Sequence, residues 1–142
     1  MLLLLSACPG PESTPPDLTA RLEPGEARAG IIVDEGSLFG GISAEGQLGD
    51  VLLYNDRVRF IVQGPRVGHY YIAQAGGVVD ADIVRPEGAL GRDLVDDWTT
   101  MMSVGRVAYA EHFAVLDDGR DSGVAHLRVW GHESPFELVT GV

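Results

Sequence analysis

Apolar and polar residues alternate along several short stretches of the chain, and this period of two is typical of β-strands with one buried face. The pattern predicts strands over residues 27–33, 50–54, 58–63 and 78–84. Asn55 and Asp56 separate two of these strands, and because both residue types tolerate positive φ, they favour a tight hairpin. We expect a helix only over residues 93–103, where acidic side chains are concentrated at the start.

The longest alternating stretch predicts a β-hairpin. Its two arms lie on either side of a polar, glycine-containing loop at residues 117–123. A register that keeps the apolar faces of both arms together pairs Ala114 with His126 and His112 with Arg128, since a shift of one residue would mix the faces. The two hairpins together place six residues in the predicted core: Val58, Phe60, Phe113, Val115, Leu127 and Val129.

The composition agrees with a β-rich fold. The chain has 142 residues, of which 45% are hydrophobic, so it can form one domain with its own core. Its 19 glycines and 8 prolines suit short strands and tight turns better than long helices. We therefore predict an all-β, antiparallel sandwich-like domain over residues 22–142. A strand pattern begins again at residues 136–139, so we expect the domain to continue beyond Val142.

Charge and cysteine content exclude several function classes. The formal net charge of −11 disfavours binding to nucleic acid and to anionic lipid through basic patches. A single cysteine excludes an intrachain disulfide and any zinc site built on a pair of cysteines. No apolar stretch reaches the roughly 18 residues of a membrane-spanning helix.

The first residues carry an export pattern. Leu5-Ser6-Ala7-Cys8 resembles the lipobox of bacterial lipoproteins, in which the cysteine thiol receives lipid and the chain is cut before it. The apolar run before Ser6 is short and no basic residue precedes Cys8, so we expect either that the true start codon lies upstream or that the sequence is shortened at this end. The alternative is an apolar terminus that contains a cysteine by chance.

The resemblance also implies an organisation and a location. Residues 1–7 would be a shortened signal peptide, and residues 8–21, rich in proline, a disordered tether that carries lipid on Cys8. In the lipoprotein family an aspartate after the cysteine marks retention at the inner membrane. Pro9 occupies that position here, which favours the outer membrane within the bacterial envelope.

A second resemblance concerns the folded part. Residues 49–65 and 76–82 resemble the N-terminal domain of uncharacterised bacterial envelope lipoproteins. That domain is similar to the β-supersandwich of galactose-mutarotase-like proteins, and in some longer relatives it precedes a metallohydrolase domain. The resemblance implies the fold more firmly than the function. Nothing in this chain matches a metallohydrolase ligand set, so no catalytic residue is carried over.

One candidate binding surface follows from the hairpin. Four side chains share the face opposite the apolar one: His112, His126, Arg128 and Trp130. A flat indole surrounded by hydrogen-bond donors is typical of a site for a sugar or a carboxylate. The alternative is an ordinary solvated sheet face, or one covered by further chain.

Two aspartates raise the question of a metal. Asp80 and Asp82 lie on the same side of their strand, and with Asp96-Asp97 or Asp117-Asp118 they would offer hard oxygen ligands to calcium. None of these pairs has the EF-hand loop pattern, and the alternative is acidic surface that favours solubility. We therefore expect no metal site, no cofactor and no catalytic residues.

Two function hypotheses follow. The first is a membrane-anchored envelope lipoprotein with a non-catalytic β-domain that binds carbohydrate or an envelope protein. The second is the leading part of a larger exported enzyme, carbohydrate-active or a metallohydrolase, whose catalytic residues lie beyond Val142.

Overall fold

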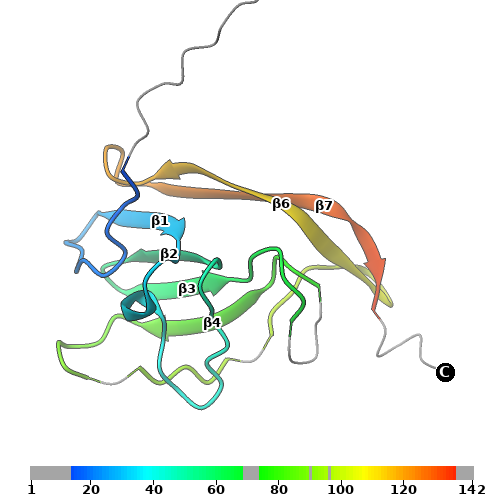
Figure 1. The fold of residues 1–142 in the computed structure, drawn as a ribbon, viewed down its shortest axis with the longest axis horizontal. Helices are drawn as coiled ribbons and strands as arrows, with labels where there is room; N and C mark the ends of the chain where they lie inside the picture. Colours follow the sequence, from blue (N-terminus) through cyan, green and yellow to red (C-terminus); the bar gives the residue numbers. More distant parts are fainter. Residues whose placement is uncertain (1–13, 69–73, 90, 96, 137–142) are drawn as a thin grey trace, which may run out of the picture.

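The computed structural model describes residues 14–68, 74–89, 91–95 and 97–136. These residues form two antiparallel sheets (Figure 1), with strand orders β1-β2-β3-β4 and β5-β6-β7. The strands are β1 (Ala27–Ile31), β2 (Val51–Asn55), β3 (Val58–Val62), β4 (Val78–Ile83), β5 (Met101–Ser103), β6 (Arg106–Asp118) and β7 (Ala125–Pro135). The predicted all-β, sandwich-like class is confirmed.

The β2–β3 hairpin forms where the sequence predicts it, although its turn works differently. The Asn55 side-chain oxygen accepts hydrogen bonds from the backbone N–H groups of Arg57 and Val58, at 2.8 and 2.9 Å. No described residue other than glycine has positive φ, so the turn at Asn55 and Asp56 does not use the positive φ that both residue types tolerate. A side-chain oxygen that caps the turn replaces it.

The main core lies on one face of the first sheet. Leu52 and Ile61 are fully buried there, under Leu22 and Phe39 from the segments before and after β1. Leu18 belongs to the same cluster and is only 6% exposed. The packed structure therefore includes a residue that the sequence assigned to the tether.

The six residues predicted for the core are only half-buried, so that prediction is wrong. The second sheet contacts the first mainly through β1 and β2, as Figure 1 shows for the long β6–β7 hairpin. Phe60 lies on β3, farther from this contact, and keeps part of its surface exposed. Burial depends on which segments cover a face, and alternation does not carry this information. It therefore assigned the core to the Phe60 side of β3, whereas Ile61 on the opposite side is the buried residue.

The β6–β7 hairpin is confirmed, but its predicted register is wrong by two residues. His112 pairs with Trp130, Ala114 with Arg128, and His126 stands opposite Asp117. The ladder shifts at two irregular places, beside Glu111 and beside Leu116, and each shift adds one residue to β6. The slip of two residues keeps the side chains between the two irregular places on their expected faces, but the irregularity at Glu111 moves Tyr109 to the face of Trp130 and His132.

The segment predicted as a helix is extended instead. Trp98 pairs with Val78 through two backbone hydrogen bonds of 2.8 and 2.9 Å, and β5 follows at Met101. Pairing with β4 and β6 thus overrides a weak helical pattern. Within the described residues the one helical element is η1 (Glu35–Ser37), a 3-10 turn, and no helix there is long and apolar enough to span a membrane. The strand predicted over residues 136–139 lies almost wholly outside the described part.

Candidate functional site

The four side chains predicted to share a hairpin face are all exposed. His126 and Trp130 are four residues apart on β7, which corresponds to about 13 Å along a strand. The structure brings only His112 and Trp130 into contact: their rings stack with centroids 5.3 Å apart and planes inclined by 29°. His126 and Arg128 extend the face toward the hairpin loop and do not join this contact.

A second aromatic pair lies two rungs away on the same hairpin. Tyr109 and His132 are direct cross-strand partners, and their rings stack at 5.2 Å with planes inclined by 28°. The Ala110–Gly131 pair separates them from the His112–Trp130 pair. The sequence pattern placed Tyr109 with the apolar core residues because the irregularity at Glu111 was not visible in it.

These aromatic rings border a groove of about 560 Å³, called the aromatic groove below. Tyr109, Trp130 and His132 line it from the hairpin, and Thr99, Thr100 and Met102 line it from the segment around β5. The indole of Trp130 is 46% exposed. The groove therefore combines flat apolar surfaces with hydroxyl and imidazole groups that form hydrogen bonds.

Charged groups beside the aromatic groove are already paired. Arg106 donates two hydrogen bonds of 2.9 Å to the carboxylate of Glu133. The Nδ1 atom of His132 lies 3.3 Å from the carboxylate of Glu111. With its carboxylates engaged, the groove offers mostly neutral surface to a ligand.

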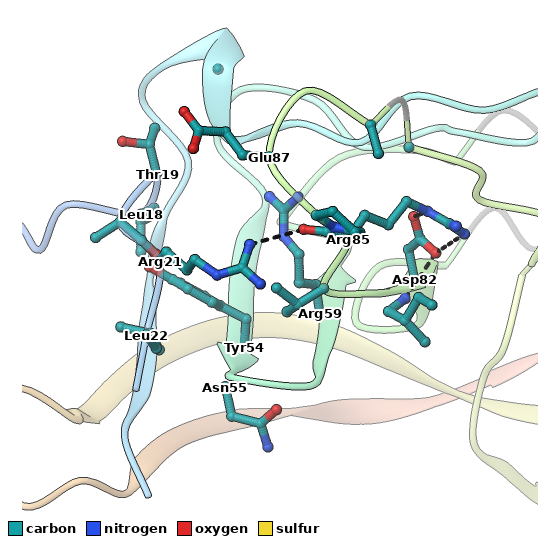
Figure 2. A pocket seen from close by; sticks show the side chains of 17 residues that line it. Leu18, Thr19, Arg21, Leu22, Tyr54, Asn55, Arg59, Asp82, Arg85 and Glu87 are labelled. Atoms are coloured by element: carbon teal, nitrogen blue, oxygen red, sulfur yellow. Dashed lines mark hydrogen bonds and ion pairs between the residues drawn. The ribbon is translucent and has the colours of Figure 1, made fainter. Parts of the chain in front are cut away.

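The structure also contains a pocket that the sequence did not indicate (Figure 2). It has a volume of about 470 Å³ and lies between the segment before β1, the strands β2 and β3, and the loop after β4. Arg21, Arg59 and Arg85 line it, together with Asp82 and Glu87, and it is called the arginine pocket below. Its lining residues come from distant parts of the chain, so no local sequence pattern predicts the pocket.

Within the arginine pocket, Arg59 is half-buried. Its guanidinium donates a hydrogen bond of 3.1 Å to the Ser37 carbonyl and lies 4.4 Å from the centre of the Phe39 ring. Burial lowers the pKa of Arg59, although Tyr54 and Asp82 oppose this effect. Burial of the Arg59 guanidinium therefore outweighs the neighbouring groups that favour its charged form.

Asp82 is bound by Arg85 through two hydrogen bonds of 2.9 and 2.6 Å. Burial opposes ionisation of Asp82, but hydrogen bonds from Arg85 and from the backbone of Arg92 and Ile83 outweigh burial and lower its pKa. Asp82 is therefore an ionised partner of Arg85.

Asp80 behaves differently from Asp82 and does not act with it. It is fully buried, so the interpretation of Asp80 as acidic surface is wrong. Its carboxylate accepts hydrogen bonds from the backbone of Glu45 and Gly46, at 2.7 and 2.9 Å. Burial raises the pKa of Asp80 to about 6, assisted by the charges of Asp93 and Asp50.

A metal site is not formed in the described part of the chain. No group of three His, Cys, Asp or Glu side chains is arranged there to hold an ion. Asp96 and Cys8 lie outside the described residues.

Comparisons of the chain with protein-family models, with curated proteins and with solved structures find no match. The resemblance to envelope lipoproteins therefore stays a prediction.

Proposed function

We propose that this chain is a lipid-anchored protein of the bacterial envelope whose β-domain binds carbohydrate in the aromatic groove. The observation that carries the proposal is the exposed indole of Trp130, which lines a groove together with Tyr109 and His132. Trp130 remains 46% exposed, so the free energy that would come from burying its apolar surface is not gained. A ligand that stacks on the ring would recover it.

The surroundings favour a neutral sugar over a charged ligand. Sugar rings present apolar C–H faces that stack on aromatic rings and hydroxyls that need hydrogen-bond partners. Thr99 and Thr100 line the groove opposite the hairpin, and threonine carries a hydroxyl group that forms hydrogen bonds. Glu133 is already bound by Arg106, so the groove has little free charge with which to attract an ion.

The membrane attachment rests on the sequence. Leu5-Ser6-Ala7-Cys8 is the lipidation pattern, and several acyl chains at about 0.8 kcal/mol per buried methylene give stable anchoring. Pro9 in place of aspartate favours the outer membrane. The proposed partners are thus a membrane, through lipid on Cys8, and a glycan of the envelope, whereas an envelope protein is the other candidate partner.

Replacement of Trp130 by alanine tests the carbohydrate site. We expect Trp130→Ala to weaken binding on a glycan array by roughly tenfold or more, because the stacking surface is lost. The melting temperature should change little, since the ring is nearly half exposed. The measurement is array binding followed by titration of the strongest neutral glycan.

Trp98→Ala is the matched control. Trp98 is also exposed, at 66%, and does not line the aromatic groove. The Trp98→Ala protein should bind glycans as the wild type does. Equal losses in both variants, or no glycan bound by the wild type, would contradict the proposed function.

A further inference from the structure

Two guanidinium groups of the arginine pocket form no ion pair with any acid in the described part of the chain. Among the described residues, no carboxylate oxygen lies within ion-pair distance of Arg21 or Arg59. Arg21 donates one hydrogen bond of 3.0 Å to the backbone carbonyl of Arg85, and Arg59 donates one of 3.1 Å to that of Ser37. Each group keeps further N–H donors, because a guanidinium carries five.

The sheet register makes this lack of a partner unexpected. Asp82 on β4 stands directly opposite Arg59 on β3, a position where opposite charges normally pair. Its carboxylate instead binds Arg85 at 2.6 Å and accepts a hydrogen bond from the backbone N–H of Arg92 at 3.1 Å. Asp82, the acid that stands opposite Arg59, is therefore already bound by Arg85.

The remaining wall of the pocket is apolar on one side. Leu18 and Leu22 from the first segment line it, together with Ile83 at the end of β4 and Pro86 from the loop that follows. Figure 2 shows the Arg21 and Arg59 side chains extending from opposite elements into the space between these segments. The space is thus bordered by guanidinium groups and by hydrocarbon.

We propose that the arginine pocket binds a small organic acid, whose carboxylate lies between Arg21 and Arg59 and whose apolar part rests on the leucine side of the pocket. Carboxylates match the planar donor geometry of guanidinium groups. The site is separate from the aromatic groove and does not depend on the function proposed for it.

Charge decides between a carboxylate and a phosphate. Three arginines line the pocket against two acids, Asp82 and Glu87, which leaves one net positive charge. One carboxylate neutralises that charge, whereas a phosphate monoester carries nearly two negative charges at pH 7. A monoanion with an apolar body is therefore the better fit in a chain whose net charge is −11.

The test uses the full chain and three probes of similar shape: phenylacetate, its neutral amide phenylacetamide, and phenyl phosphate. Binding is followed by NMR of the arginine Nε–H groups, with Arg21 and Arg59 assigned from their variants. We expect phenylacetate to shift both resonances and to bind more tightly than the other two probes. Loss of one guanidinium in Arg59→Gln should weaken phenylacetate binding about tenfold or more.

Arg57→Gln is the matched control. It removes the same charge from the same hairpin, but its side chain is 83% exposed and outside the pocket. Arg21 is exposed, so Arg21→Gln provides a second pocket variant that should fold even if Arg59→Gln does not. Equal binding of acid and amide, tighter binding of phenyl phosphate, no shift at either arginine, or an equal loss in Arg57→Gln would overturn the proposal.

Discussion

At the scale of single residues, two buried aspartates differ in the groups that bind their carboxylates. Asp50 accepts two hydrogen bonds from Arg66, at 2.9 and 2.7 Å, and two more from the backbone of Gln47 and Gly64. Asp80 is equally buried but receives only backbone N–H groups. Burial raises the pKa of Asp80 to about 6, and the charges of Asp93 and Asp50 add to this rise.

The raised pKa of Asp80 predicts a dependence of stability on pH. Between pH 4 and 6 the folded state keeps a proton that the unfolded chain has lost, so the free energy of unfolding falls as pH rises through this range. The fall should be at most about 3 kcal/mol, from about 1.4 kcal/mol per pKa unit. Urea unfolding at several pH values should show this fall for the wild type and not for Asp80→Asn.

Asp82→Asn is the control for that measurement. The pKa of Asp82 is lowered, so its contribution to stability is lost only as pH falls below about 4. The slope between pH 4 and 6 should therefore persist in this variant. A wild type and an Asp80→Asn protein with the same slope in that range would contradict the assignment.

At the scale of elements, the β6–β7 hairpin depends on its irregularities. The shift beside Glu111 brings the Tyr109 carbonyl and the Glu111 N–H group against Gly131. A Cβ atom at Gly131 would overlap with the Tyr109 carbonyl oxygen and lie 2.9 Å from the Glu111 nitrogen. The same place separates the two aromatic pairs, so a glycine on β7 permits the close approach on which the groove geometry depends.

Gly131→Ala should therefore destabilise the domain. We expect a loss of about 1–3 kcal/mol in the free energy of unfolding, as for other overpacked sites, measured by urea denaturation. The matched control is Gly40→Ala, where an added Cβ would make only ordinary contacts of 3.7–3.9 Å. A Gly131→Ala protein as stable as this control would show that the hairpin adjusts without cost.

At the scale of the whole molecule, the tether and the aromatic groove lie at different ends of the long hairpin. Arg120, in the hairpin loop, donates a hydrogen bond of 2.9 Å to the Thr14 carbonyl, so the N-terminal segment meets the loop end (Figure 1). His132 is seven residues along β7 from Ala125, about 23 Å away along the strand. The aromatic groove therefore lies far along the hairpin from the first described residue, Thr14.

Anchoring itself is tested by labelling cells with a fatty-acid analogue. The full-length protein should take up the label and fractionate with membranes, whereas Cys8→Ala should do neither, because the thiol is the group that accepts lipid. Pro11→Ala changes the proposed tether without removing the cysteine and should be labelled normally. Equal labelling of the wild type and Cys8→Ala would disprove the lipoprotein assignment.

The sequence by itself determined the positions of most strands, the all-β class and the face on which most hairpin side chains lie, with Tyr109 as an exception. These properties follow from local alternation and turn residues. Trp130 stays on its predicted face even though the pairing of β6 with β7 differs from the predicted register by two residues. Local patterns carry this information because the side-chain direction of a strand depends only on neighbours in the chain.

Tertiary structure alone decided which face of the first sheet forms the main core, which rungs pair on the hairpin, and where Arg21, Arg59 and Arg85 meet. Burial depends on which segments cover a face, and here Leu18 and the loop at Phe39 cover the side that alternation did not favour. The arginine pocket joins segments more than sixty residues apart, as the bond from Arg21 to Arg85 shows. Such convergence is set by packing across the whole chain, and no local pattern of residues encodes it.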